Sequence, residues 1–229
     1  METDVAPQVT NRKWYEIWWD VWRHPGTDVF RRLLQEPGAD YNRGFKWVAL
    51  MAVIFAVLNS LISGIFPQRI ASAASSGMIT SLVCGVIVAP IVAVIAITIM
   101  AGIYHWIAKL FGGNGEWGQL VFCFSVVLAP SYLLTALFRP LYRTDLGSLF
   151  SQGTSALAQQ MSSLFFCLVL PSLALSIYSV VLNICAIKAV ENIDTGRSIL
   201  TYFIPVIVAI LLAACVSVLL VFPALNATR

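Results

Sequence analysis

The chain has 229 residues, of which 59% are apolar and 11% are charged. Soluble domains carry about 45–50% apolar and about 25% charged residues, so this composition excludes an ordinary soluble domain and indicates an integral membrane protein. A net charge of +3 is too small to indicate a nucleic-acid partner. The five cysteines lie in apolar stretches without a Cys-x-x-Cys pair, so we expect no disulfide framework, no metal site and no cofactor.

The chain begins with a segment that precedes any long apolar stretch. Residues 1–13 are expected to be flexible, and residues 14–45 are expected to form a cytosolic, interfacial, amphipathic segment. Within it, Trp14, Trp18 and Trp22 recur at a spacing of four residues, which predicts a helix with an aromatic face.

A second short helix is predicted to follow the first. The residues His24-Pro25-Gly26 end the first helix, and Thr27 is expected to cap a helix over Asp28–Gln35 whose apolar stripe includes Phe30. Two compatible interpretations remain open. The helices could lie on the inner leaflet, where tryptophan rings are favoured, or they could form a docking surface for a cytosolic partner.

Five long apolar stretches occupy the rest of the chain. A helix of about 20 residues crosses a hydrocarbon core of about 30 Å. Backbone polar groups have no water partner inside this core, so a chain that crosses it must form a helix. Residues 46–222 are therefore predicted to form an all-α bundle of five transmembrane helices, followed by a short external tail, 223–229. A four-span alternative would make one stretch interfacial. The stretches are Trp47–Phe66, Met78–Leu110, Leu120–Phe138, Ser162–Ile187 and Ile199–Phe222.

Basic residues orient these spans, because cytosolic segments carry an excess of lysine and arginine. With a cytosolic N-terminus, ten basic residues lie inside and four lie outside. The inside residues are Arg12, Lys13, Arg23, Arg31, Arg32, Arg43, Lys46, Lys109, Lys188 and Arg197. The outside residues are Arg69, Arg139, Arg143 and Arg229. In the outside loop 139–161, apolar residues between Leu146 and Leu157 predict a short amphipathic helix, with an irregular loop as the alternative.

A glycine-rich turn lies between the second and third stretches. Gly112, Gly113 and Gly115 precede Trp117, but no Lys-Ser/Thr pair follows them and no strand precedes them, so this is neither a phosphate-binding loop nor a dinucleotide fingerprint. We expect a tight cytosolic turn that uses glycine at positive φ, with Trp117 as an anchor. A contact with a lipid headgroup or a partner is the alternative interpretation.

Some polar side chains inside the stretches could mark a pathway. Among them are Asn59, Ser60, Thr98, His105 and Asn183. No acidic residue lies deep in a span, so helix packing is a better explanation for them than a transport pathway. His105 is expected near the cytosolic end of its span. No Ser–His arrangement with a nucleophile elbow and no metal-ligand spacing is present in the sequence, so we expect no enzyme.

The order of these motifs resembles the Ypt-interacting-protein (YIP) domain family. The similarity rests on Trp18 to Pro25 followed by Phe30, on the glycine-rich turn, on Ser125 to Pro130, and on Tyr178 to Lys188 followed by Asp194 to Ser198. It extends over residues 14–222. The resemblance implies a five-span integral membrane protein, and the short tryptophan-rich start is more similar to prokaryotic members. Binding of a small GTPase is implied only by analogy with eukaryotic members.

These observations together predict a non-catalytic membrane scaffold that presents a cytosolic surface to protein or lipid partners. The alternative is a small transporter or channel subunit. Membrane lipids, a cytosolic protein and a homo- or hetero-oligomer are the expected partners. The membrane is the plasma membrane in a prokaryote or a secretory-pathway membrane in a eukaryote. The expected site residues are Trp18, Trp22, Arg23, His24, Pro25, Phe30, Gly112, Gly113, Gly115 and Trp117.

Overall fold

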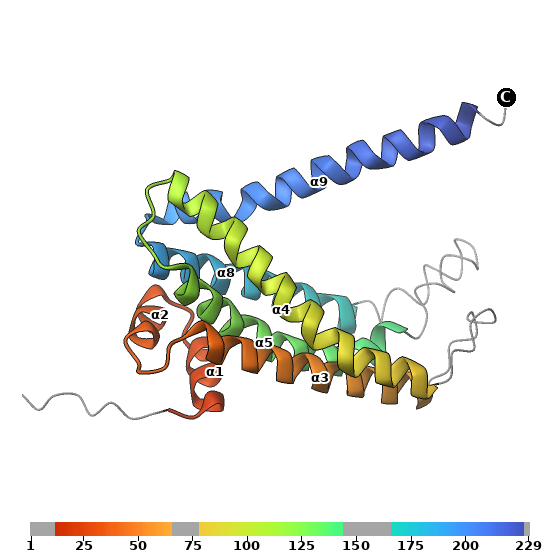
Figure 1. Cartoon of the computed structure of the whole chain (residues 1–229), viewed down its shortest axis with the longest axis horizontal. Coiled ribbons are helices and arrows are strands. Elements are labelled where there is room, and N and C mark those ends of the chain that lie inside the picture. Colours follow the sequence, from red (N-terminus) through yellow and green to blue (C-terminus); the bar gives the residue numbers. More distant parts are fainter. Residues whose placement is uncertain (1–11, 66–77, 144–165, 227–229) are drawn as a thin grey trace, which may run out of the picture.

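A computed structural model of the chain describes residues 12–65, 78–143 and 166–226. Within these ranges the fold consists of seven α-helices and no strand, which confirms the predicted all-α class (Figure 1). Two short helices, α1 (Trp14–Arg23) and α2 (Thr27–Leu34), precede the long ones. The long helices are α3 (Tyr41–Ile65), α4 (Met78–Leu110), α5 (Trp117–Arg143), α8 (Phe166–Glu191) and α9 (Thr195–Asn226).

All five long helices are long and apolar enough to cross a membrane, which confirms the predicted five spans. Several extend past their apolar stretches: α3 begins at Tyr41 rather than Trp47, and α8 ends at Glu191 rather than Ile187. Hydropathy marks only the part of a helix that needs an apolar surrounding, whereas backbone hydrogen bonding continues into polar flanks until a cap or turn ends it. The helix α4 runs unbroken through Pro90 for 33 residues.

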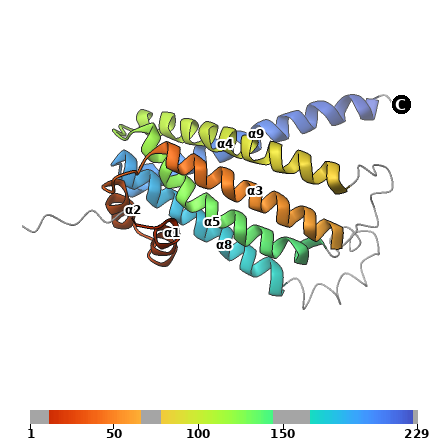
Figure 2. The same cartoon turned by 60° about the horizontal axis from the view of Figure 1, so that its bottom comes forward.

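The long helices alternate in direction, so the chain returns twice to the end of the bundle where it entered α3 (Figures 1 and 2). We call this the α1–α2 end. It comprises α1, α2, the turn 111–116 between α4 and α5, and the turn 192–194 between α8 and α9. The predicted binding residues all lie at this end, although they come from two separate parts of the sequence, 18–30 and 112–117.

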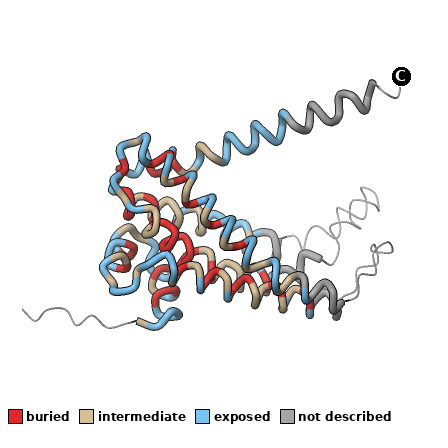
Figure 3. Tube along the Cα trace, in the orientation of Figure 1, coloured by how far each residue is buried: buried red, intermediate tan, exposed pale blue. Residues whose placement is uncertain are grey.

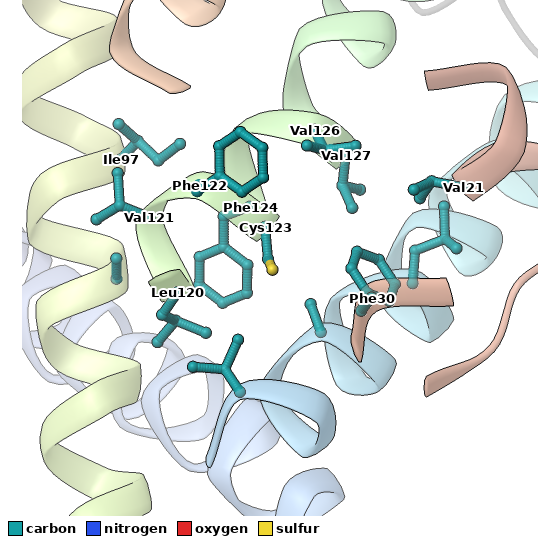
Figure 4. Close-up of a cluster of buried hydrophobic side chains, with 14 of the residues drawn as sticks. Val21, Phe30, Ile97, Leu120, Val121, Phe122, Cys123, Phe124, Val126 and Val127 are labelled. Atoms are coloured by element: carbon teal, nitrogen blue, oxygen red, sulfur yellow. The ribbon is translucent and has the colours of Figure 1, made fainter. Parts of the chain in front are cut away.

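Helix α5 lies at the centre of the bundle. Of the residues in its apolar span 56% are buried, compared with 11% in α9. Side chains from Leu120 to Val127 are surrounded by α4, α8 and the short helices, as the close-up in Figure 4 shows with Ile97, Val21 and Phe30 around them. Because burial is concentrated near the α1–α2 end (Figure 3), this end is the better-packed part of the described bundle.

The short helices pack against the bundle with their apolar faces. Helix α1 contacts α5, and α2 contacts α8. Their inward residues are Ile17, Trp18, Val21, Val29, Phe30 and Leu33, all buried. The prediction that Thr27 caps the second helix was wrong: Gly26 occupies the N-cap in an extended conformation and Thr27 is the first helical residue. Glycine is accepted at an N-cap because the position is not itself helical.

Helix α9 packs on α4 and α8 near its start and then diverges from them (Figure 1). Ser198 and Thr201 are fully buried, whereas residues 206–215 are exposed. In a bilayer such an apolar surface faces lipid. The amphipathic helix predicted for the outside loop lies largely in residues 144–165, outside the described ranges.

Candidate functional site

The structure corrects the expectation that Trp18 and Phe30 form part of an exposed binding surface. Phe30 is fully buried and Trp18 is only 6% exposed. The Trp18 ring lies 5.9 Å from that of Trp47 on α3. The Trp22 ring lies 5.6 Å from that of Tyr178 on α8, and the Tyr178 hydroxyl donates a hydrogen bond to the backbone carbonyl of Trp22. These aromatic residues anchor the short helices to the bundle, since burial of large rings removes much apolar area from water.

Arg23, His24 and Pro25 do lie on the surface. All three are exposed, and the His24 ring nitrogen Nδ1 lies 3.4 Å from a carboxylate oxygen of Asp20. Trp19 is 67% exposed on the outward face of α1. Arg31 and Arg32 are likewise exposed on the last turn of α2. The outward side of α1 and α2 therefore carries Trp19 and three arginines, together with the exposed acids Glu16 and Asp28.

A polar network fixes α1 against the segment that follows α2. The Arg12 guanidinium donates to Asp20 at 2.9 Å and also to Glu36, and the Arg43 guanidinium donates to the Arg12 carbonyl at 2.9 Å. Arg43 in turn lies over the Trp47 ring at 4.9 Å from its centroid. Partial burial lowers the pKa of Arg12, but hydrogen bonds and charges of Asp20 and Glu36 outweigh this and raise its pKa overall. Arg12 thus remains a permanent cation that joins two carboxylates.

The glycine-rich turn is a close-packed structure rather than an open loop. Gly112 has a φ of 87°, a conformation that favours glycine. A Cβ on Gly113 would lie 2.7 Å from the Glu191 carboxylate and 2.9 Å from the Ala108 carbonyl, so no larger residue fits there without movement. A Cβ on Gly115 would lie 2.9 Å from the same carboxylate. The glycines let the turn backbone approach the end of α8.

Glu191 is the residue to which this turn is bound. It is fully buried, its Oε1 lies 2.6 Å from Nδ1 of His105 on α4, and its Oε2 accepts the Gly115 amide at 3.0 Å. The Glu191 carbonyl also accepts the Asn114 amide at 3.1 Å. One carboxylate thus joins α4, α8 and the turn.

Glu191 was not among the predicted site residues, because an acid at the end of an apolar stretch is expected to face water. Its partner His105 is 86 residues away in the sequence, and helix periodicity alone could not pair them. One signal was present: a histidine inside an apolar stretch next to a three-glycine turn suggests a buried polar partner.

Tyr41, at the start of α3, packs against the first residues of α5 that follow the glycine-rich turn. The Tyr41 ring lies 6.0 Å from that of Trp117, which is half-buried, and contacts the position of Gly118. On the other side of the turn, Arg197 donates to the Phe111 carbonyl at 3.0 Å and pairs with Asp194 at 3.2 Å. The predicted site residues therefore share one end of the bundle.

The histidine and acidic side chains at this end do not gather into a metal-binding group in the part of the chain that the structure describes. Over residues 12–65, 78–143 and 166–226, no group of three histidine, cysteine, aspartate or glutamate side chains is close enough to hold a metal ion. The Glu191 carboxylate is already engaged by a ring nitrogen and a backbone amide.

Five apolar helices, with short helices docked at one end, define an integral, multi-pass membrane protein. The sequence profile of the Yip1 domain matches residues 19–217, and the chain belongs to this family. The match includes the buried aromatic anchors from Trp22 onward, the glycine-rich turn and Glu191. Comparison with curated proteins gave no match, and neither did comparison with solved structures.

Proposed function

We propose that this protein is a non-catalytic membrane scaffold whose working surface is the α1–α2 end, facing the cytosol. The observation that carries the proposal is the docking of α1 and α2. Their inward apolar residues, from Ile17 to Leu33, are buried against the bundle, while Arg23, Arg31 and Arg32 remain exposed in a fixed arrangement. A preorganised surface binds a partner with less loss of conformational freedom than a flexible tail.

The exposed charges define the chemistry of that surface. On α1 and α2 the exposed charged residues are Arg23, Arg31 and Arg32 with Glu16 and Asp28, which leaves a small basic excess. Arg12, which precedes α1, is engaged with Asp20 and Glu36. Such a surface suits acidic protein segments or anionic headgroups. The distribution of basic residues around the spans favours a cytosolic position for this surface. Each basic residue close to an anionic leaflet adds about 1 kcal/mol of attraction.

The polar residues of the spans support a scaffold rather than a transporter. Most hydroxyl groups for which bonds are resolved donate to the carbonyl four residues earlier in their own helix. Examples are Thr98 to Val94 and Ser125 to Val121, both at 2.7 Å. These bonds satisfy the hydroxyls within single helices, so they do not line up as a path for solute.

Charge reversal tests the proposal. Arg23, Arg31 and Arg32 are replaced together by glutamate, and proteins and lipids that copurify from native membranes are quantified by mass spectrometry. The exposed positions should tolerate the change, so abundance and insertion are retained while bound partners are lost. Arg69→Glu, on the opposite side in the expected topology, is the matched control and should retain them.

Unchanged recovery of partners from the triple variant would contradict the proposed surface. Solute flux through purified protein in liposomes, abolished by Asn183→Ala, would instead favour the transporter.

A further inference from the structure

Helix α1 lies on the flank of the bundle rather than beyond its end. The Trp18 ring packs on Trp47 of α3, and the Trp22 ring packs on Tyr178 of α8. Both partners lie within the apolar spans of their helices. Tyr178 lies thirteen residues before Glu191, the last residue of α8, which corresponds to about 20 Å along the helix at about 1.5 Å per residue. Figures 1 and 2 agree, since α1 lies further from this end of the bundle than α2 does.

The central helix α5 supplies the rest of this docking face. Helix α1 packs on α5, and Figure 4 shows Val21 of α1 in the same buried cluster as Val127 of α5. The α5 sequence carries no charge between Trp117 and Phe138. The surfaces against which α1 packs therefore belong to the part of the bundle that a bilayer surrounds. Because α1 lies on the outside of that part, its opposite face is directed toward the surrounding lipid.

The opposite face of α1 has the composition of a membrane interface. Tyr15, Trp19 and Arg23 follow one another at a spacing of four residues, so they form one stripe along the helix. Tyr15 is 47% exposed and Trp19 is 67% exposed, and Arg23 is exposed as well. Tyrosine and tryptophan are enriched at the headgroup level of membranes, because their rings are apolar and each carries one polar group. The stripe therefore matches the layer that its position in the fold places beside it.

The charges of α1 are also compatible with lipid phosphate. Asp20 is engaged by the Arg12 guanidinium at 2.9 Å. Glu16 is exposed, but its carboxylate accepts the Lys13 amide at 3.1 Å at the start of the helix. Arg23, at the other end of the stripe, presents a guanidinium, which forms paired hydrogen bonds with phosphate groups. The stripe thus combines two rings for the headgroup level with one cation for the phosphate.

We propose that the outward face of α1 lies in the headgroup layer of the surrounding bilayer, with the Tyr15 and Trp19 rings among the lipid headgroups and Arg23 beside their phosphates. The inference rests on the proposed function, because it names the ligand of one part of the α1–α2 end. That ligand is phospholipid rather than an acidic protein segment. Inward packing holds α1 on the bundle, and outward contact holds it at the membrane surface.

The test measures the surroundings of nitroxide labels, introduced singly as Tyr15→Cys and Arg23→Cys in chains whose native cysteines are replaced by alanine. Trp19 stays in place between the two positions. The full chain is reconstituted in vesicles of phosphatidylcholine and phosphatidylglycerol. Electron paramagnetic resonance then compares the collisions of each label with oxygen, which concentrates in lipid, and with a water-soluble nickel chelate. Labels at Asn114 in the turn and at Leu173 on α8, both exposed, are the references for water and for lipid.

We expect the labels at positions 15 and 23 to collide with the nickel chelate severalfold less often than the label at Asn114, and more often than the label at Leu173. Equal nickel access at positions 15, 23 and 114 would overturn the proposal, because the face would then lie in water. Low access to both oxygen and nickel would also overturn it, since a second copy of the chain would then cover α1.

A second measurement keeps every native cysteine and changes only one ring. The tryptophan emission that is lost on Trp19→Phe should be quenched by phospholipid brominated close to its headgroup and should resist aqueous iodide. Quenching by iodide alone would contradict the proposal.

Both measurements use purified protein without a partner, so they separate this inference from the proposed function. A water-exposed stripe, with partners still lost in the triple arginine variant, would refute the lipid contact alone. A stripe in the headgroup layer, with partner recovery unchanged in that variant, would support the lipid contact and refute the proposed surface.

Discussion

At the scale of single residues, the space around each position at the α1–α2 end decides which side chains fit there. Gly113 has a carboxylate and a backbone carbonyl where a methyl group would be placed, whereas Gly102 on α4 has its nearest neighbour, the Trp117 indole nitrogen, at 4.0 Å. Gly102 therefore has room for a methyl group, whereas Gly113 does not.

Gly113→Ala is expected to lower the free energy of unfolding by about 1–3 kcal/mol, because the Ala108 carbonyl belongs to the backbone and cannot rotate away. Unfolding by denaturant in mixed micelles measures this loss. Gly102→Ala is the control, and it should not lower the free energy of unfolding, because glycine inside a helix is about 0.5–1 kcal/mol less stable than alanine. Equal effects of the two substitutions would show that the turn is not packed on Glu191.

Phe30→Ala is expected to undock α2 from the bundle, since removal of a buried phenylalanine costs about 3–5 kcal/mol. Trypsin should then cleave the chain at Arg31 and Arg32 more than tenfold faster than in the native protein. Trp19→Ala, which changes an aromatic residue that is 67% exposed, should leave the cleavage rate unchanged. If Phe30→Ala and Trp19→Ala resisted trypsin equally well, Phe30 would not contribute to the docking of α2.

At the scale of elements, the sequence specified most of the fold. It predicted α1 over its full length and α4 with the same ends, because helical spacing and apolar runs are local signals. It did not predict how the short helices dock. A tryptophan stripe fits a headgroup layer or a protein groove equally well, and only the position of Trp47 and Tyr178 selects the groove. The Glu191–His105 pair was not predicted for the same reason: its partners are 86 residues apart and meet only in the folded bundle.

Tyr178→Phe tests the docking of α1 on α8. The change removes one hydrogen bond to the Trp22 carbonyl but keeps the ring, so α1 should lose about 0.5–1.5 kcal/mol of local stability. Amide hydrogen exchange should become up to about tenfold faster in residues 14–23 and stay constant in α4. Faster exchange throughout the chain would point to a global effect instead.

At the scale of the whole molecule, the account depends on which side of the membrane carries the α1–α2 end. All ten basic residues expected inside come from the segments and helix ends that gather there or from the residues that precede α1. A membrane-impermeant thiol reagent applied to intact cells should therefore spare Asn114→Cys and label Ser151→Cys, in a background without native cysteines. The reverse pattern would invert the topology.

The most direct measurement of the central claim is photo-crosslinking in native membranes from Arg23 and Arg31 on the docked helices, with Leu173 on α8 as an exposed apolar reference. Arg23 and Arg31 should give the same discrete protein or headgroup adducts, and Leu173 should give only acyl-chain adducts. Absence of such adducts at Arg23 and Arg31, with equal yields at all three positions, would contradict a working surface at the α1–α2 end.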